Sequence, residues 1–159
     1  LLENPGLRQR MLVGEQAERY AILHEILRLE PVVSHLYRRT TAPLTFESDG
    51  ETVEIPAGTL LDLHLRAANA DERAMGDAPD ALCPMRERTP MRPKVPEFGL
   101  SFGDGAHRCP GAYVAIQESD ILLRKLLALP TLRIEGQPSV SEFRIAESYE
   151  VRDIFVAVD

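Results

Sequence analysis

The chain has 159 residues, of which 44% are hydrophobic, and a formal net charge of −7. This length suffices for one domain with a buried core, and the negative charge argues against a nucleic-acid partner or an anionic membrane surface. No run of about 18 apolar residues is present, so we expect no membrane partner. The two cysteines are far apart and no signal-peptide pattern is visible, which excludes a disulfide framework and predicts a cytoplasmic protein.

The first part of the chain is predicted to be helical. Asn4 before Pro5 is typical of a helix N-cap followed by the first helical position, and the short helix that follows should end at Gly14. A second helix is predicted over residues 15–30, where a proline follows it. The first residue is leucine rather than methionine, so we expect a trimmed chain or a piece of a longer one.

The sequence period then changes to that of strands. Residues 44–47 and 52–55 alternate in polarity around Asp49-Gly50, which predicts a β-hairpin. A further strand is predicted over residues 59–65, and a brief helix over residues 66–73.

The second half of the chain begins with an irregular connection over residues 76–99, which contains five prolines. A long helix is predicted over residues 111–129, and short strands over residues 131–159, the last of them at 154–158. The predicted fold class is therefore α+β, with small antiparallel hairpins beside helices.

One cysteine ends a glycine-rich loop immediately before the long helix. The stretch FGLSFGDGAHRCPGAYVA covers residues 98–115 and contains Cys109. Pro110 fits the first helical position, which predicts that Cys109 lies at or next to the N-cap. Unpaired N–H groups and the helix dipole favour a thiolate there. Such a thiolate suits a nucleophile or a metal ligand, and a half-buried structural cysteine is the alternative.

Other candidate groups carry less chemistry. His107 and Cys109 could be half of a zinc site, but no Cys-x-x-Cys motif supplies the rest, and no second histidine is tied to Cys109 as in a cysteine hydrolase. Cys83 is expected to be a buried structural thiol. The polar residues expected on a solvated face of the long helix are Gln117, Glu118, Asp120, Arg124 and Lys125.

The loop follows a pattern of phenylalanine, glycines, a basic residue and cysteine, continued by an alanine in the helix. Its members are Phe102, Gly103, Gly105, His107, Cys109, Gly111 and Ala115. This pattern resembles the haem-binding loop of the cytochrome P-450 family.

The resemblance implies a role for each of these residues. Cys109 would be the proximal ligand of the iron of haem b (iron protoporphyrin IX), and Phe102 would pack beside the thiolate. The glycines would let backbone N–H groups approach the sulfur, and His107 would reach a haem propionate. Thiolate ligation in this family favours O–O bond cleavage.

Two further motifs agree with the resemblance. Glu25-x-x-Arg28 resembles the family's helix motif, although an i,i+3 ion pair alone is commonplace. We assign Arg86 as the third member of this charge network. Arg38 is expected to bind the second propionate, with Arg39 as the alternative. The resemblance also places residues 34–36 near the distal haem edge. It implies that the final hairpin, around residues 148–151, corresponds to a family loop that touches substrate.

The resemblance covers residues 1–159 and only the C-terminal, proximal portion of the family fold, without the distal oxygen-binding helix. It implies a parent haem-thiolate monooxygenase that uses a ferredoxin-type electron donor and inserts oxygen into a small organic substrate. The alternative is a non-catalytic fragment or haem-binding remnant. We also expect self-association through the exposed haem-facing surface.

Overall fold

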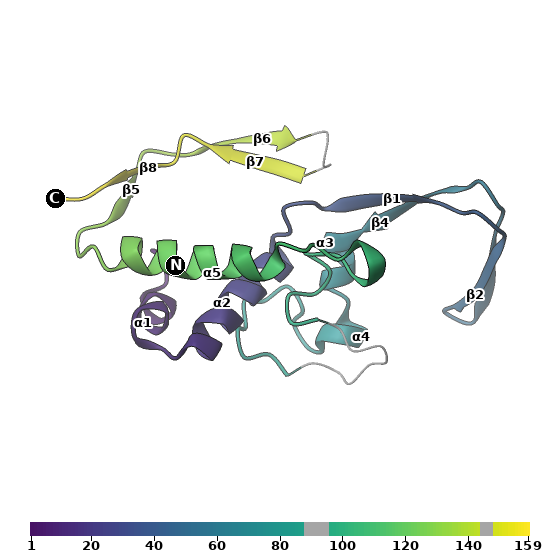
Figure 1. Cartoon of the computed structure of the whole chain (residues 1–159), viewed down its shortest axis with the longest axis horizontal. Coiled ribbons are helices and arrows are strands. Elements are labelled where there is room, and N and C mark those ends of the chain that lie inside the picture. The colour runs from purple at the N-terminus through teal and green to yellow at the C-terminus, as the bar shows by residue number, and fades with distance from the viewer. Residues whose placement is uncertain (88–95, 144–147) are drawn as a thin grey trace.

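Helices in the lower half and narrow β-ribbons at the edges make up the molecule (Figure 1). The computed structural model describes residues 1–87, 96–143 and 148–159. Within these ranges the strands pair only as two-stranded antiparallel sheets. None of the helices in the same ranges is long and apolar enough to cross a membrane.

The N-terminal helices confirm the capping prediction. Helix α1 (Pro5–Val13) begins after Asn4, whose side-chain oxygen accepts a hydrogen bond from the backbone N–H of Leu7 at 3.0 Å. This bond satisfies one of the N–H groups that a helix start leaves unpaired. Gly14 ends α1, and helix α2 (Gln16–Leu29) follows.

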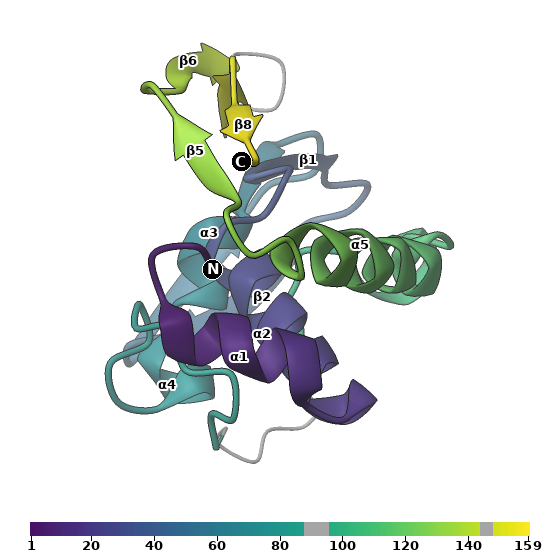
Figure 2. The same ribbon diagram turned by 90° about the vertical axis from the view of Figure 1, so that its left-hand side faces the viewer.

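Helix α5 (Ala112–Leu127) packs against both α1 and α2, and the views of Figures 1 and 2 agree on this arrangement. The apolar sides of the three helices form the main core of the described chain. Its buried members are Leu7, Met11, Ile22, Leu23, Ile116 and Leu127. Phe102, from the loop before α5, packs against the edge of this cluster, so the core also anchors the cysteine loop.

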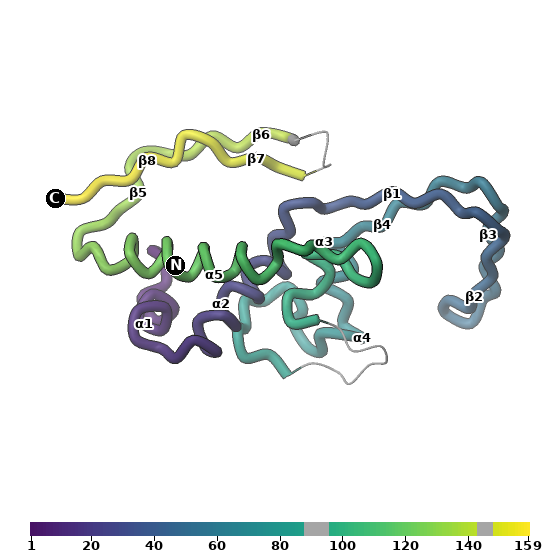
Figure 3. The backbone as a smooth tube through the Cα atoms, viewed as in Figure 1, coloured from purple at the N-terminus to yellow at the C-terminus, as the bar shows by residue number. Residues whose placement is uncertain are grey.

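The predicted hairpin is present as β2 (Leu44–Ser48) and β3 (Glu51–Ile55), joined by Asp49 and Gly50. Both turn residues have positive φ, at 52° and 84°, which is the backbone that a two-residue hairpin turn requires. The hairpin forms an arm at the far end of the molecule from both termini (Figure 3).

The sequence analysis missed strand β1 (His35–Arg39), which pairs with β4 (Leu60–His64). The predicted brief helix is two helices, α3 (Leu65–Asn69) and α4 (Glu72–Met75). Asp71 separates them, because its side chain accepts from the N–H of Arg73 and caps α4.

The C-terminal strands form two ribbons away from the helical core (Figure 1). Strand β5 (Arg133–Glu135) pairs with β8 (Phe155–Ala157), and β6 (Ser139–Phe143) pairs with β7 (Ser148–Arg152). The hairpin expected around residues 148–151 agrees with this pairing, in which β7 is one of the two strands. Residues 88–95 of the predicted irregular connection lie outside the described residues.

Candidate functional site

The cysteine loop is held by its own backbone. The N–H of Cys109 donates to the carbonyl oxygen of Phe102 at 2.8 Å, and the N–H of Gly103 donates to the carbonyl oxygen of Leu100, also at 2.8 Å. Gly103 has a φ of +67°, and a Cβ there would lie 3.3 Å from the carbonyl oxygen of His107. A side chain at position 103 would therefore strain the turn that brings Phe102 and Cys109 together.

Cys109 presents an exposed thiol that is not in a disulfide. The prediction that it lies at or next to the N-cap was wrong, because Cys109 lies two residues before the N-cap. Helix α5 begins at Ala112 with Gly111 as N-cap, so Cys109 and Pro110 belong to the preceding turn. The first α-helical bond runs from the N–H of Ala115 to the carbonyl oxygen of Gly111 at 2.9 Å, which fixes the later start.

Aromatic and basic groups surround the loop. The rings of Phe98 and Phe102 meet edge to face, with centroids 5.0 Å apart. The Arg108 guanidinium lies 5.5 Å from the ring centroid of Phe98 and 5.8 Å from that of Tyr113, within the range of cation–π attraction. His107 is exposed in the short 3-10 helix η1 (Gly105–His107), and Ala115 is half-buried on α5.

The structure brings Glu25, Arg28 and Arg86 together in one network. Arg28 donates two hydrogen bonds to the carboxylate of Glu25, each 2.8 Å long, and both side chains are buried. The Nε of Arg86 lies 3.4 Å from the same carboxylate, and its Nη groups donate to backbone carbonyls, including that of Asp77 at 2.8 Å. Arg86 therefore ties the irregular segment to α2.

Two opposing influences act on the pKa of Glu25. Burial is the largest and raises it, but hydrogen bonds from Arg28, from the N–H of Cys83 and from Arg86 together hold the pKa below its ordinary value. The N–H of Cys83 contributes at 3.1 Å. The Cys83 thiol is exposed, so the expectation of a buried structural cysteine was wrong: the backbone of this residue faces the network and its side chain does not.

A second buried ion pair links α2 to α5 and was missed. Arg19 donates to both oxygens of Asp120, at 2.7 Å and 2.9 Å, and both residues are buried. The hydrogen bond from Arg19 to Asp120 is the largest cause of the raised pKa of Arg19. The expectation that Asp120 belongs to a solvated face was wrong, because its partner comes from another helix and no local spacing reveals it.

The two candidate propionate ligands lie on β1. Arg38 is exposed and donates to the carbonyl oxygen of Tyr37 at 2.8 Å, and Arg39 is exposed and donates to that of Gly58 at 2.6 Å. The pairing with β4 places Arg38 and Leu36 on one face of the ribbon and Arg39 on the other. Only one of the two arginines can therefore face a ligand bound on a given side of β1.

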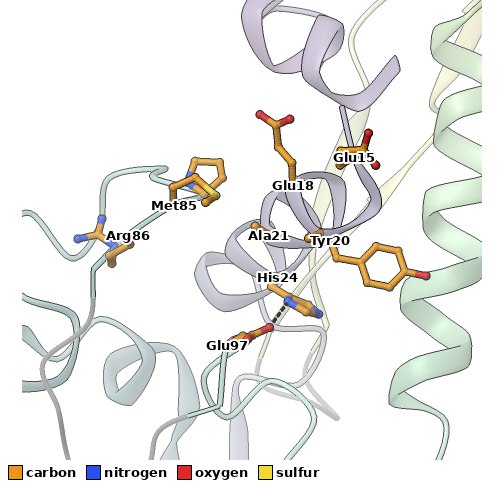
Figure 4. A pocket seen from close by; sticks show the side chains of 10 residues that line it. Glu15, Glu18, Tyr20, Ala21, His24, Met85, Arg86 and Glu97 are labelled. Carbon is orange, nitrogen blue, oxygen red and sulfur yellow. Dashed lines mark ion pairs between the residues drawn. The ribbon is translucent and has the colours of Figure 1, made fainter. Parts of the chain in front are cut away.

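Among the described residues, α2 borders two of the principal clefts. The larger, of about 750 Å³, lies between α2 and the segment that carries Met85 and Arg86 (Figure 4). In it His24 Nδ1 lies 3.2 Å from a carboxylate oxygen of Glu97. The second, of about 490 Å³, is lined by His24, Arg108 and Tyr113 among others. Cys109 lines neither cleft, so the candidate ligand faces open surface instead.

Among residues 1–87, 96–143 and 148–159, no group of three or more histidine, cysteine or acidic side chains is arranged to hold a metal ion.

A family model described as Cytochrome P450 matches residues 20–143. The chain belongs to the cytochrome P450 family. Cytochrome P450 130 of Mycobacterium tuberculosis is 36% identical to it over 128 residues, which are 80% of this chain and 29% of that protein. Erythromycin C-12 hydroxylase of Saccharopolyspora erythraea is 32% identical over 108 residues, which are 68% of this chain and 24% of the hydroxylase.

Solved P450 structures agree with this assignment. CYP164A2 of Mycobacterium smegmatis, solved with econazole bound, has a TM-score of 0.74 and 30% identity, covering 99% of this chain and 36% of that one. The α+β architecture predicted from the sequence is thus confirmed as a partial P450 fold. The chain spans less than a third of the length of the two curated P450 relatives named above.

Proposed function

We propose that this chain supplies the thiolate ligand and one wall of the haem site of a P450 monooxygenase. The observation that carries the proposal is Cys109, an exposed, unbridged thiol at the end of a loop whose backbone is fixed on both sides. A lone thiolate on a rigid loop suits a haem iron, because the porphyrin supplies the equatorial ligands and the protein needs to add one. The residues present therefore fit the group.

The residues that would hold haem b come from two parts of the chain. Cys109 would ligate the iron, with Phe102, Gly103, Gly111 and Ala115 beside the macrocycle. Two basic residues, His107 and Arg38, would each bind a propionate, and both are exposed in the described structure. Bound haem would supply the oxygen chemistry, and the protein would supply the ligand, orientation and electrostatics.

The chain's own residues would act chiefly by fixing the position of the sulfur. The Glu25–Arg28–Arg86 network would hold the irregular segment, and the Arg19–Asp120 pair would hold α5. Each pair is removed from water, so each resists the fluctuations that would let the loop move.

A monooxygenase of this kind would take electrons from a ferredoxin-type donor and would act on a small organic substrate. The hydroxylase named among the relatives supports the reaction class. We further propose a cytoplasmic protein, which the two free thiols support, since a reducing compartment keeps thiols unpaired.

A second candidate function applies to the 159-residue chain alone: it would bind haem without completing the monooxygenase reaction. This is supported by the share of its relatives that it spans and by apolar side chains exposed on α5, including Tyr113, Val114 and Leu122. These side chains would be covered in a larger assembly or by a second copy of the chain.

The two cysteines provide a matched test of the ligand. After reconstitution with haem, the ferrous carbon monoxide complex of the chain and of the Cys83→Ser variant should both show a thiolate-type Soret band. The Cys109→Ser variant should lose that band, because an alcohol is a poor substitute for the thiolate. An unchanged band in Cys109→Ser, or its loss in Cys83→Ser alone, would overturn the assignment of Cys109.

A further inference from the structure

A buried asparagine joins the cysteine loop to helix α2. Asn69, the last residue of α3, is only 1% exposed. Its side-chain oxygen accepts from the N–H of Leu100 at 2.6 Å, and its side-chain nitrogen donates to the carbonyl oxygen of Arg28 at 3.0 Å. The two ends of one amide thus bind the loop on one side and the helix on the other.

A serine and an arginine complete the connection. Ser101 accepts from the Asn69 nitrogen at 3.0 Å and donates its hydroxyl to the carbonyl oxygen of Leu27 at 2.6 Å. The Arg28 guanidinium donates to the backbone carbonyl oxygen of Asn69 at 2.6 Å. The polar groups of Asn69 are therefore satisfied, which a buried amide requires.

The backbone of the cysteine loop approaches Asn69 so closely that only glycine fits at position 99, immediately before Leu100. Gly99 has a φ of +60°, and a Cβ there would lie 2.3 Å from the side-chain oxygen of Asn69. This distance is far below van der Waals contact, so the backbone of the loop rests directly on the asparagine.

The contact reaches Cys109 through two backbone hydrogen bonds. Asn69 holds the N–H of Leu100, and the carbonyl oxygen of Leu100 accepts from the N–H of Gly103. Two residues after Leu100, the carbonyl oxygen of Phe102 accepts from the N–H of Cys109. Moving residues 100–102 therefore moves the group to which the cysteine backbone is bonded.

We propose that Asn69 is a positioning residue for the Cys109 thiolate, acting through the Leu100–Phe102 backbone. Its role as a positioner of an iron ligand rests on the proposed function, whereas its effect on the loop does not. The amide is needed because one side chain must both accept from the loop and donate to α2. Aspartate has the same shape but lacks the donor, and would set an oxygen against the carbonyl oxygen of Arg28.

The chain offers a matched control for the change from asparagine to aspartate. Among the described residues, Asn4 bonds through its side-chain oxygen, as the N-cap of α1, where aspartate serves equally well. We would compare Asn69→Asp, Asn4→Asp and the unchanged chain by residue-resolved amide hydrogen exchange. In Asn69→Asp the repulsion between the new carboxylate oxygen and the carbonyl oxygen of Arg28 should displace the group that accepts from Leu100. The amides of Leu100 and Cys109 should therefore exchange about tenfold faster, while α1 amides stay protected.

A second measurement follows the sulfur itself. In a Cys83→Ser background, the rate at which a thiol reagent alkylates Cys109 should change several-fold in Asn69→Asp and stay constant in Asn4→Asp. In the haem-reconstituted chain, Asn69→Asp should lower the fraction of the carbon monoxide complex that shows the thiolate-type Soret band. A role in general stability alone would lower all amide protection and leave that fraction unchanged, which would overturn the proposal.

If Asn69→Asp does not fold, Ser101→Ala tests the same connection. It removes the hydroxyl that accepts from the Asn69 side chain and donates to the carbonyl oxygen of Leu27. Loop exchange in Ser101→Ala equal to that of the unchanged chain would also overturn the proposal. Retention of the thiolate-type band in Cys109→Ser would refute the ligand assignment, yet faster loop exchange in Asn69→Asp would still establish that Asn69 positions the loop. The two failures are therefore distinguishable.

Discussion

At the scale of single residues, Glu25 has two arginine partners from different parts of the chain. It is buried to 1% exposure, between Arg28 on its own helix and Arg86 from the irregular segment. Removing one partner of a buried ion pair leaves an uncompensated charge. We therefore expect Glu25→Ala to lower the free energy of unfolding by about 3–5 kcal/mol.

Urea unfolding would measure this change, with Glu18→Ala as the control. Glu18 also pairs with an arginine, Arg10, at 2.6 Å, but its side chain is 36% exposed. Exposed pairs contribute about 0–1 kcal/mol, so the control should change little. Equal losses in the two variants would contradict the buried-network argument.

The direction of the pKa shift of Glu25 predicts how stability depends on pH. Its pKa in the folded chain lies below the ordinary value of 4.5, so the ionised carboxylate stabilises the fold above that pH. This contribution is lost as pH falls from about 4.5 through the lowered folded-state pKa. Urea unfolding at a series of acidic pH values should show a shallower loss in Glu25→Gln, and parallel curves would count against the assignment.

What the sequence predicts at this scale depends on distance along the chain. Glu25 and Arg28 lie three positions apart, so helical spacing alone pairs them. Asp120 and Arg19 are 101 positions apart, so no local spacing pairs them. The neighbouring Glu118 instead favoured the prediction that this face of the helix is solvated. Asn69 carries no sequence signal by itself, because its partners are mostly backbone groups of distant residues.

At the scale of elements, the Arg19–Asp120 pair fixes α5 on α2 at the level of the core. Asp120→Ala should strand the buried guanidinium and lower the free energy of unfolding by about 3–5 kcal/mol. Glu118→Ala, two positions earlier and exposed, should stay within about 0.5 kcal/mol of the unchanged chain. Thermal unfolding of both variants would check this, and a mild effect of Asp120→Ala would show that packing alone holds α5.

A side-chain hydrogen bond joins the C-terminal ribbon of β6 and β7 to the end of α2. The hydroxyl of Tyr149 donates to Glu30 at 2.7 Å, and Arg66 lies 3.2 Å from the other oxygen of that carboxylate. The hydrogen bond to Glu30 is the main cause that raises the pKa of Tyr149 above its ordinary value of 10.0.

The hydrogen bond between Tyr149 and Glu30 should break in alkaline solution. A raised tyrosine pKa means that the bond stabilises below pH 10.0 and is lost as the pH rises through the folded-state value. In a titration followed by phenolate absorbance, one tyrosine should ionise at a pH above the ordinary tyrosine pKa. Glu30→Gln should lower the pKa of that tyrosine toward its ordinary value. Tyr149→Phe should speed amide exchange in β7 without affecting α1. If every tyrosine of the unchanged chain ionised at its ordinary pKa, the Tyr149–Glu30 hydrogen bond would be contradicted.

The elements that the sequence predicted are those with local signals. Caps, prolines and the Asp49-Gly50 turn placed α1, α2 and the β2–β3 hairpin. Strand β1 was missed because its partner β4 lies over 20 residues away and its own residues, His35–Arg39, do not alternate cleanly in polarity. Helix α5 starts later than predicted because Pro110 belongs to a turn.

At the scale of the whole molecule, the described chain exposes many large apolar side chains. On α5 alone, Tyr113, Val114, Ile121 and Leu122 are each at least 48% exposed. Exposed apolar groups that gather on one element are typical of an interaction surface. The chain also covers only 36% of the CYP164A2 structure, one of the P450 structures to which it is similar.

These observations lead to the prediction that the isolated chain does not catalyse monooxygenation at rates ordinary for the family. A haem held on the Cys109 side alone would lack a second apolar wall, and its affinity should fall because burial contributes about 25 cal/mol per Å². Organised proton delivery would also need a positioned acid, and we assign that role to no residue of the cysteine loop. The test is oxidation of a broad substrate panel by the purified, haem-loaded chain, driven either by peroxide or by NADPH with a ferredoxin system, and with Cys109→Ser as the control. Background oxidation equal in the two chains is the expected result. Rapid turnover that depends on Cys109, with no other polypeptide beyond the electron donor, would show that this third of a P450 fold is sufficient for the reaction.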